Sequence, residues 1–328
     1  MKAVSFNQFG AASDVLAVSL LAAPKPQAGE VLVRMASSGV NPSDVKKRAG
    51  AFPDLLDYGP VIPHSDGAGV IEAVGEGVSE ERLGERVFVY QAQHGRSMGT
   101  AADYVAIDSS RAPSLPAEAS FAVGACIGIP IMTAHRCVTV DGPVGGLWVL
   151  VTGGAGRVGH YAIQWAKQFG ARVLSTASNA DDTKACYEAG AECVVNHRES
   201  GWGQQLLDYT NGQKIDRVIE VEFGANLSEV LSCIRVGGTI ATYSSTVDPE
   251  PKLPFRTMMF MDLTIHLVIV YDMPETAKMT AIADTQDFLS GGKLVHRITH
   301  TLPLSETVRA HELIESGTVR GCVILEHS

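Results

Sequence analysis

A glycine-rich turn between an apolar run and a helix-like segment constrains the fold of this chain most. The run occupies residues 148–151, and the apolar periodicity of a helix follows the turn over 158–169. Three glycines of the turn fit the spacing G-x-G-x-x-G and a fourth gives an overlapping register: Gly153, Gly154, Gly156 and Gly159. Glycine permits a tight strand-to-helix turn and close backbone approach to a pyrophosphate, which the helix amino terminus attracts. With a second strand expected at 171–177, the sequence predicts a dinucleotide-binding βαβ unit; a purely structural turn is the alternative.

Length and charge limit the class of protein. At 328 residues the chain is long enough for two domains, and its 45% hydrophobic and 19% charged residues are ordinary for a globular protein. The net charge of −10 argues against nucleic acid or an anionic membrane as the main partner. The most apolar window, 258–271, is interrupted by Asp262 and His266 and is too short to span a bilayer. We therefore expect no membrane partner and interpret this window as a buried strand.

The cysteines and the amino terminus indicate a compartment. The 6 cysteines are scattered and form no C-x-x-C pair. They are typical of reduced thiols that are buried as small apolar residues. Residues 1–7 are typical of a strand and not of a signal peptide. These features favour a cytoplasmic protein.

Two patterns of secondary structure follow each other along the chain. The first third contains short β-branched runs separated by turn residues, at 30–36, 69–74 and 86–90. After about residue 120, strands near 171–177, 192–196, 215–221 and 238–244 alternate with helical segments near 158–169, 181–190, 202–210 and 225–235. This alternation predicts a parallel sheet that is covered by helices on both faces. A strand near 263–271 and a helix near 275–290 complete it, and the tail carries a helix near 304–316 and a strand at 321–326.

Several segments of the chain resemble segments of a known protein family, and they follow one another in the same order as in that family. Besides the glycine turn, they are 38–44, 63–70, 84–87, 99–105, 129–136 and 195–199. Over nearly its whole length the chain resembles the quinone oxidoreductase (zeta-crystallin-like) branch of the medium-chain dehydrogenase/reductase superfamily. The resemblance implies an α/β protein with a GroES-like β-rich catalytic domain (1–122 and 293–328) and a Rossmann doubly wound parallel-sheet domain (123–292). It also implies an active cleft between the domains and a homodimer joined through the edge strand near 263–271.

The resemblance also bears on zinc, which relatives with alcohol dehydrogenase activity use. A catalytic zinc needs thiolate and imidazole ligands with one open position. Where the zinc branch has its first cysteine this chain has the turn 39–41, its ligand histidine is replaced by Ser65, and its third ligand falls near Ile129. His64 is one residue out of register, so its side chain is expected to point elsewhere. We predict no zinc, which favours acceptors that take a hydride unaided, namely quinones and activated enones.

The end of the second expected strand predicts the nucleotide. A site selective for NAD usually has an acidic side chain there, whereas 175–179 contains no carboxylate. This favours the 2′-phosphate of NADPH, with NADH as the less favoured cofactor. The resemblance places Ser178, Lys184 and His197 around that phosphate, with Arg198 as a possible helper. Negative charge at 181–182 opposes this assignment, although capping of the next helix is the favoured interpretation of these two aspartates.

The rest of the nucleotide is assigned to three further segments. The glycine turn is expected to hold the pyrophosphate with Gly153, Gly154, Ala155, Gly156, Arg157, Val158 and Gly159, although the Arg157 side chain has solvation as its alternative. By resemblance, the ribose and pyrophosphate edge is formed by Asn226, Tyr243, Ser244 and Ser245. The nicotinamide carboxamide is assigned to the backbone of Leu267, Val268 and Ile269.

The acceptor pocket is the least constrained part of the prediction. Asn41 is the first candidate, because its amide can hydrogen-bond the nicotinamide ribose or an acceptor oxygen without ionising; a role in shaping the turn is the alternative. Lys46 replaces a tyrosine that relatives often carry. The expected pocket is completed by Tyr58, His64, Tyr90 and Thr133, with His94 and His135 as further candidates, and a structural role is the alternative for the tyrosines and histidines.

Taken together, these residues predict a zinc-independent, NADPH-dependent oxidoreductase that reduces a small-molecule acceptor. A quinone is the expected acceptor, and reduction of the C=C bond of an alkenal or enone is the nearest alternative. A non-catalytic NADPH-binding sensor or crystallin-like protein is the alternative of another class, because binding alone needs no reactive pocket.

Overall fold

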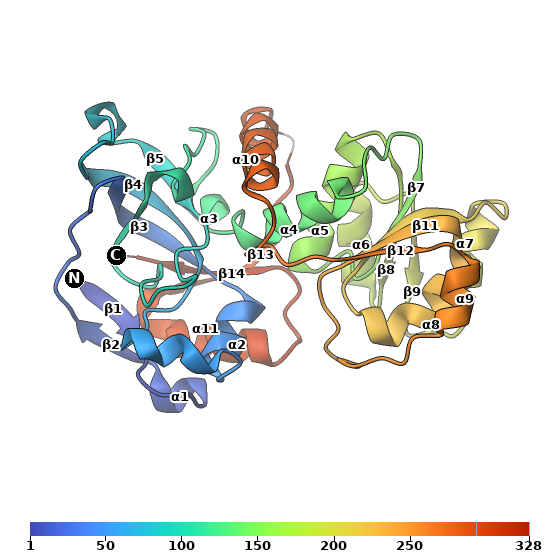
Figure 1. Ribbon diagram of the computed structural model, residues 1–328, viewed down its shortest axis with the longest axis horizontal. Coiled ribbons are helices and arrows are strands. Elements are labelled where there is room, and N and C mark those ends of the chain that lie inside the picture. The colour runs from blue at the N-terminus through green and yellow to red at the C-terminus, as the bar shows by residue number, and fades with distance from the viewer. Residues whose placement is uncertain (293, 328) are drawn as a thin grey trace. The chain divides into compact units, whose positions relative to one another are not determined.

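The computed structural model describes residues 1–292 and 294–327, except for the side chain of Tyr58, and divides the chain into two compact units (Figure 1). Unit 1 consists of Met1–Ile129 with Ile282–Ser328, and unit 2 of Pro130–Ala281. The domain boundaries expected from the sequence, at 122/123 and 292/293, stay a prediction. Helix α10 (Glu275–Ser290) runs across the second division between the units.

Unit 1 is built on a mostly antiparallel six-stranded sheet. Its order is β13-β14-β3-β4-β5, with β6 also paired to β3. The strands are β3 (Glu30–Val40), β4 (Asp66–Val74), β5 (Arg86–Val89), β6 (Tyr104–Asp108), β13 (Ile298–Pro303) and β14 (Cys322–Glu326). Strand β14 lies antiparallel to β3, with Val323 opposite Val40, so the tail returns to the amino-terminal strands as predicted. Figure 1 shows these red tail strands beside the blue ones.

The remaining elements of unit 1 are short. A two-stranded sheet is formed by β1 (Lys2–Ser5) and β2 (Ala17–Leu20). The α-helices are α1 (Ala12–Val15), α2 (Pro42–Arg48), α3 (Phe121–Gly124) and α11 (Thr307–Glu315). Four 3₁₀ turns lie at η1 (Pro53–Tyr58), η2 (Glu80–Arg82), η3 (Ser109–Arg111) and η4 (Leu304–Glu306). The helix expected near 304–316 is therefore a 3₁₀ turn followed by α11.

The core of unit 1 follows the two-residue period of its strands. Along β3 the buried positions alternate at Val31, Val33 and Met35. They pack with residues of the neighbouring strands in one cluster that includes Ile71, Val87, Val89, Val105 and Ile107. The alternation that predicted strands in the sequence thus also defines the buried face of the sheet.

Unit 2 contains a six-stranded sheet in which every pairing is parallel. The strand order is β12-β11-β10-β7-β8-β9. The strands are β7 (Trp148–Val151), β8 (Arg172–Ala177), β9 (Cys193–Asn196), β10 (Ile215–Glu220), β11 (Ile234–Thr242) and β12 (Thr264–Leu267). The order reverses between β7 and β10, which is the doubly wound Rossmann arrangement predicted from the alternation. Ligands of such sheets bind beyond the carboxyl ends of the strands at this reversal.

Helices follow the strands of unit 2, as the alternation predicts. They are α4 (Ile129–Thr139), α5 (Arg157–Gln168), α6 (Ala180–Ala189), α7 (Trp202–Tyr209), α8 (Phe223–Cys233) and α9 (Phe255–Phe260). Among the residues that the structure describes, no helix combines the length and apolar character that crossing a membrane requires.

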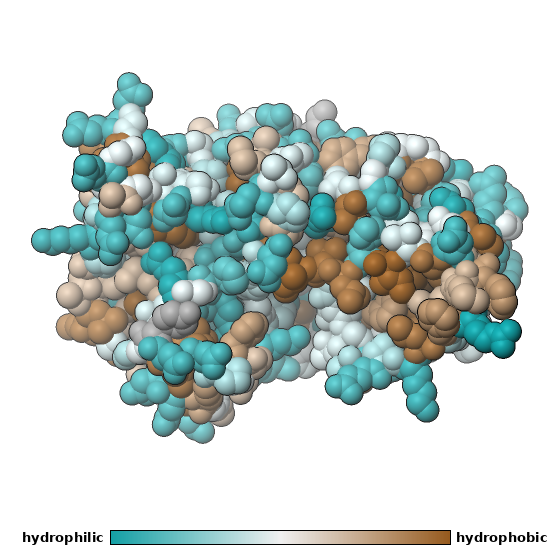
Figure 2. All heavy atoms as spheres, in the orientation of Figure 1, coloured by the Kyte–Doolittle hydropathy of each residue, from teal (hydrophilic) through white to brown (hydrophobic). Residues whose placement is uncertain are grey.

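The prediction of a buried strand over 258–271 is wrong. The window contains the end of α9 and only four residues of strand, β12, which lies at the edge of the sheet. Leu267 is 80% exposed and Phe260 is 70% exposed. Figure 2 shows brown and tan apolar side chains over α9 and β12. Within the described residues β12 is paired on one side only, so part of this apolar window is exposed, whereas Met258, Val268, Val270 and Tyr271 are buried.

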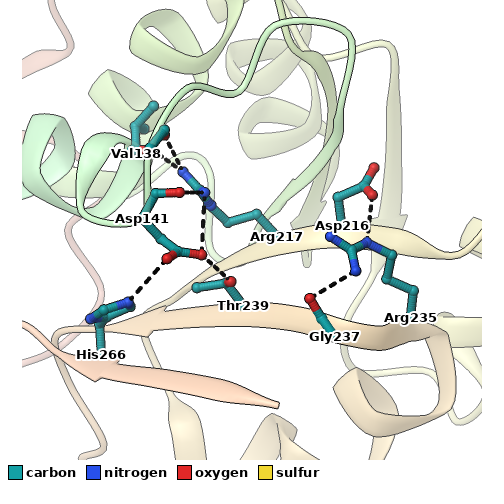
Figure 3. Close-up of polar contacts among 9 residues, drawn as sticks. Val138, Asp141, Asp216, Arg217, Arg235, Gly237, Thr239 and His266 are labelled. Atoms are coloured by element: carbon teal, nitrogen blue, oxygen red, sulfur yellow. Dashed lines mark hydrogen bonds and ion pairs between the residues drawn. The ribbon is translucent and has the colours of Figure 1, made fainter. Parts of the chain in front are cut away.

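A buried arginine fixes this edge of the sheet. Arg217 of β10 is 3% exposed and donates to the carbonyl oxygen of Val138 at 2.6 Å (Figure 3). It also forms an ion pair with Asp141, 3.5 Å away. The Asp141 carboxylate accepts from the Thr239 hydroxyl and lies 3.8 Å from His266 Nε2. The hydrogen bond from Thr239 and the charge of Arg217 lower the pKa of Asp141. The loop after α4 thus contacts three adjacent strands, β10, β11 and β12.

Candidate functional site

The glycine turn joins β7 to α5 in a conformation that side chains would prevent. Gly153 has φ of +59°, in the left-handed region that favours glycine. A Cβ atom at Gly159 would lie 2.4 Å from the carbonyl oxygen of Gly153, and one at Gly154 would lie 2.0 Å from Ser175 Oγ. These contacts are too short for any residue but glycine. The turn therefore brings its backbone close to β8 and begins α5 at Gly156, its N-cap.

Hydrogen bonds hold this turn to the neighbouring strands. The Gly153 backbone N–H donates to Thr176 Oγ1 at 2.9 Å, and the Gly154 N–H donates to the Thr176 carbonyl oxygen at 3.2 Å. The hydroxyl of Thr152 donates to Glu220 Oε1 at 2.8 Å, across to the end of β10. The turn therefore lies at the reversal of strand order, and the amino terminus of α5 follows it. This is the geometry of a pyrophosphate site.

Glu220 organises the adjacent strand end. Its Oε1 atom accepts from Thr152 Oγ1, from the Glu222 backbone N–H at 2.6 Å and from Asn226 Nδ2 at 2.8 Å. Burial raises the pKa of Glu220, and these hydrogen bonds oppose the shift. The carboxylate thereby fixes the side chain of Asn226, one of the predicted ribose residues. Tyr243 directly follows β11, and burial raises the pKa of its hydroxyl above the ordinary value.

The charges at the end of β8 bear on the prediction that the nucleotide is NADPH and not NADH. Asn179 is the N-cap of α6: its Oδ1 accepts from the Asp182 backbone N–H at 2.9 Å, and its Nδ2 donates to Asp182 Oδ2 at 2.8 Å. The cap is thus Asn179 and not the two aspartates, which lie in the first turn of α6; Asp182 is 4% exposed and accepts from the Asn179 side chain. Asp181 is exposed.

The residues assigned to the 2′-phosphate lie around this helix start. Ser178 and His197 are half-buried, and Arg198 is exposed. The Lys184 ammonium lies 3.7 Å from Glu188 Oε1, with 77% of its side chain exposed. An exposed ion pair of this kind is weak, which leaves the ammonium available to a phosphate.

Asn41 lies where β3 passes into α2. Its backbone N–H donates to Asp44 Oδ2 at 2.8 Å, in a capping box at the start of the helix. Its Nδ2 atom donates to Asp66 Oδ2 at 2.7 Å, and Asn41 is 3% exposed. The carboxamide is therefore fixed in one orientation. Both interpretations made from the sequence, a turn-shaping role and a ligand contact, are compatible with this placement.

The other pocket candidates differ in their surroundings. The His64 ring is fully buried, with Nδ1 2.8 Å from Ser38 Oγ and Nε2 2.9 Å from His311 Nε2. The Tyr90 hydroxyl donates to the Ser110 carbonyl oxygen at 3.3 Å. The remaining candidates are placed as follows: Lys46 is exposed on α2, Thr133 and His135 are buried on α4, His94 is exposed, and the side chain of Tyr58 lies outside the described residues.

The backbone assigned to the nicotinamide follows β12. The Val268 N–H donates to the Thr242 carbonyl oxygen at 2.7 Å, which continues the parallel pairing with β11. Leu267 and Ile269 are 80% and 54% exposed. Their side chains therefore point to the surface of unit 2.

Comparison with known proteins agrees with this geometry. Residues 27–117 match the alcohol dehydrogenase GroES-like domain family, and residues 158–285 match the zinc-binding dehydrogenase family. Human quinone oxidoreductase is 33% identical over 97% of this chain and 95% of that protein. The chain belongs to the quinone oxidoreductase branch of the medium-chain dehydrogenase/reductase superfamily.

Two more distant relatives are relevant to the chemistry of this oxidoreductase. A tomato 2-methylene-furan-3-one reductase is 26% identical, over 99% of this chain and 79% of that protein. A mycobacterial protein solved in complex with NADPH is 26% identical with a TM-score of 0.87, and the match covers 99% of both chains.

In this chain, the side chains at the positions where the zinc branch has its ligands do not suit zinc. Within 1–292 and 294–327, no three His, Cys, Asp or Glu side chains are grouped to hold a metal ion. Where the zinc branch has its ligands, this chain has the turn 39–41, a hydroxyl at Ser65 and an aliphatic side chain near Ile129. None of these supplies the thiolate or imidazole that zinc prefers.

Sequence reasoning missed a charged group beside Asn41. The Asp66 carboxylate is completely buried, and burial raises its pKa to about 8. Lys47 is 5% exposed, its ammonium donates to the Gln93 carbonyl oxygen, and burial lowers its pKa. One signal was available for Lys47: it follows Asp44 by three residues on α2, so both share a helix face, which Lys46 does not. Glu220 also had a signal, because it ends an apolar strand at the edge of the sheet that carries the glycine turn.

Proposed function

We propose that this oxidoreductase is zinc-independent and transfers a hydride from NADPH to a quinone. The observation that carries the proposal is the glycine turn at the reversal of strand order, beside a second strand that ends without a carboxylate at 175–179. The human relative named as a quinone oxidoreductase and the mycobacterial NADPH complex support it.

The glycine turn suits the nucleotide, because glycine at 154 and 159 lets the backbone pack closely against Ser175 and Gly153 and so begin α5 directly after the turn. The turn would hold the pyrophosphate at the amino terminus of α5. The 2′-phosphate would be held by Ser178, Lys184 and His197 with help from Arg198, the ribose edge by Asn226 and residues 243–245, and the carboxamide by the backbone of 267–269. Bound NADPH supplies the hydride from its nicotinamide ring.

The protein contributes alignment in this proposal. Hydride transfer needs the nicotinamide and the acceptor carbon about 3–3.5 Å apart, in a pocket without water. Asn41, at the start of α2, would orient the nicotinamide ribose or the acceptor oxygen. Lys46 replaces the tyrosine of many relatives and would add positive charge to the acceptor pocket, which Tyr58, His64, Tyr90 and Thr133 would complete.

A second acceptor class has one observation in its favour. The tomato relative is named as a reductase of 2-methylene-furan-3-one, which is an enone. We therefore keep reduction of enone or alkenal C=C bonds as the alternative activity.

Parallel assays with each acceptor test these activities. The purified protein is mixed with NADPH or NADH and either 1,2-naphthoquinone or an α,β-unsaturated aldehyde, and cofactor oxidation is followed by absorbance. We expect oxidation of NADPH with the quinone and a slower rate with NADH. Oxidation with the aldehyde alone would overturn the quinone assignment. Binding of NADPH without turnover of any acceptor would favour the non-catalytic sensor.

We also propose that two copies of this chain associate through β12. In the part of the chain that the structure describes, β12 is an edge strand. The apolar surface around it includes Phe255, Met259, Phe260, Leu267 and Ile269, each more than half exposed. Exposed apolar surface next to an unpaired strand edge is typical of an interface. A hollow of about 390 Å³ between α9 and β12 would receive side chains of the second copy. The six cysteines are thiols that form no disulfide within the described residues, which supports our proposal of a cytoplasmic location.

A further inference from the structure

A buried carboxylate that the proposed function does not use lies directly against Asn41. Asp66 begins β4, and its Oδ2 atom accepts from two donors at once: Asn41 Nδ2 at 2.7 Å and the backbone N–H of Ile129 at 2.8 Å. Ile129 is the first residue of α4. One oxygen atom thus connects the end of β3, the start of β4 and the start of α4.

The packing around this carboxylate gives it a single position. A Cβ atom at Gly128 would lie 2.1 Å from Asp66 Oδ1 and 2.6 Å from Asp66 Cγ. A Cβ atom at Gly39 would lie 2.0 Å from the Ala125 carbonyl oxygen and 3.4 Å from Asp66 Cβ. The backbone at Gly128 therefore approaches the carboxylate as closely as only glycine allows, and Gly39 packs equally closely against the backbone of Ala125.

The charges around Asp66 do not offset its burial. Burial is the main cause that raises its pKa; the Ile129 N–H, Asn41 and the Lys47 ammonium favour the ionised form, whereas Asp44 opposes it. Asp44 and Lys47, both on α2, are the charged groups that face it. A carboxyl group placed where burial disfavours its charge is a poor source of stability. Such groups cluster at functional sites.

We propose that Asp66 is the positioning residue of the reductase site, which holds the Asn41 carboxamide in the orientation that its ligand requires. The proposal rests on the proposed function, because it concerns the same site. Asp66 is completely buried and acts through Asn41, not by contact with the acceptor. The competing role is purely structural, in which the carboxylate only anchors the first turn of α4.

A double-mutant cycle separates the two roles. The variants are Asp66→Asn, Asn41→Ala and the combination of both, with kcat measured for the quinone acceptor. Misplacement of a positioned group by about 1 Å can lower a rate by about a hundredfold, so we expect Asp66→Asn to lower kcat by about 10- to 100-fold. If Asp66 acts through Asn41, the double variant is no slower than Asn41→Ala. Losses that multiply in the double variant would overturn the proposal.

The pH profile gives a second readout. The ionised carboxylate accepts its two hydrogen bonds more strongly than the neutral acid does. The kcat of the natural protein is therefore expected to rise as the pH passes through about 8, the pKa of Asp66, and Asp66→Asn is expected to remove this rise. The matched control is Asp216→Asn, because Asp216 also accepts from a backbone N–H (Trp148, 2.9 Å) and a side chain (Arg235, 2.7 Å). The control should keep both kcat and the rise. An unchanged rise in Asp66→Asn would contradict the proposal.

A further variant tests Asp66 while the carboxylate is still present, and an NMR measurement tests it without turnover. Gly128→Ala displaces the Asp66 carboxylate and should also lower kcat. The side-chain amide signal of Asn41 in a ¹⁵N–¹H NMR spectrum, identified by its absence from Asn41→Ala, should shift as the pH passes through about 8 and stay constant in Asp66→Asn. A constant signal in the natural protein contradicts the role of Asp66. Absence of turnover with a responsive signal contradicts the proposed function alone.

Discussion

At the scale of single residues, one exposed cation is expected to distinguish the two nucleotides. The Lys184 ammonium lies 3.7 Å from Glu188 in an exposed ion pair, which is weak, so it can turn to a 2′-phosphate. A hydrogen bond to a charged group contributes about 1.5–3 kcal/mol, or about 10- to 100-fold in affinity. We predict that Lys184→Met raises the Kd for NADPH by about tenfold or more and leaves the Kd for NADH within about twofold, as measured by fluorescence titration.

Lys214 offers a matched control for this lysine. Its ammonium donates to the Ser232 carbonyl oxygen at 2.6 Å on the exposed surface, and it has no assigned role in the nucleotide site. Lys214→Met should bind both nucleotides as the natural protein does. If Lys184→Met weakened the binding of NADPH and NADH equally, Lys184 would not be a ligand of the 2′-phosphate.

A pair of histidines makes the stability of the protein depend on pH. His311 is buried against His64, and burial, with a smaller effect of Arg48, lowers its pKa to about 3. Between about pH 6.5 and pH 3, His311 is protonated in the unfolded chain but not in the folded chain. The stabilisation is therefore complete above pH 6.5 and is lost as the pH falls towards 3. At pH 5 the loss is about 2 kcal/mol from His311 alone.

Urea unfolding at pH 7.5 and pH 5.0 measures this dependence. We predict that His311→Gln is destabilised at pH 7.5 but loses about 2 kcal/mol less than the natural protein between the two pH values. His300→Gln, at a half-buried position on β13, should leave the difference unchanged. The same loss in His311→Gln as in the natural protein would exclude His311 as its source.

The residues around Asn41 show where sequence reasoning stopped. The sequence pointed to Asn41 because of its amide, and to Lys46 because it replaces a tyrosine that relatives often carry. It did not point to Asp66 and Lys47, which lie close in space to Asn41. A buried charge cannot be recognised from residue type, because its partners come from β4, α2 and the start of α4.

At the scale of secondary-structure elements, the glycine turn is the most predictable part of the molecule. A Cβ at Gly159 would lie 2.4 Å from the Gly153 carbonyl oxygen, so Gly159→Ala must move the start of α5. Overpacking of this kind costs about 1–3 kcal/mol. We predict at least about a tenfold weaker binding of NADPH in a titration followed by nucleotide fluorescence. In the control Gly145→Ala, the new Cβ lies 3.5 Å from its nearest neighbour, Phe169 O, and binding should not change; equal binding by both variants would contradict the assigned turn.

The elements of unit 2 could be predicted because helices and strands alternate with clear periods. The edge of the sheet could not. The window 258–271 is as apolar as a buried strand, yet it contains the end of helix α9 and the short strand β12. Local hydrophobicity does not distinguish burial inside one chain from an apolar surface. The network of Arg217, Asp141 and Thr239 that holds this edge joins segments far apart in the sequence and has no local signal.

At the scale of the whole molecule, the surface around β12 is expected to determine the oligomeric state. A lysine in place of Leu267, which is 80% exposed, would bring a charge to an apolar interface. We predict that the natural protein sediments as a dimer and that Leu267→Lys sediments as a monomer in analytical ultracentrifugation. Leu83→Lys, at an exposed position of unit 1, should remain dimeric. A monomeric natural protein, or a dimeric Leu267→Lys variant, would contradict association through β12.

At this scale, the central claim of the proposed function is hydride transfer without a metal at the turn 39–41, Ser65 and the start of α4. The most direct measurement is quinone-dependent NADPH oxidation by protein that has been treated with a chelator, with the zinc content determined in the same sample. We predict the full rate of 1,2-naphthoquinone reduction in protein that contains a negligible amount of zinc. A rate that rises in proportion to bound zinc, or the absence of any quinone-dependent oxidation, would contradict this prediction.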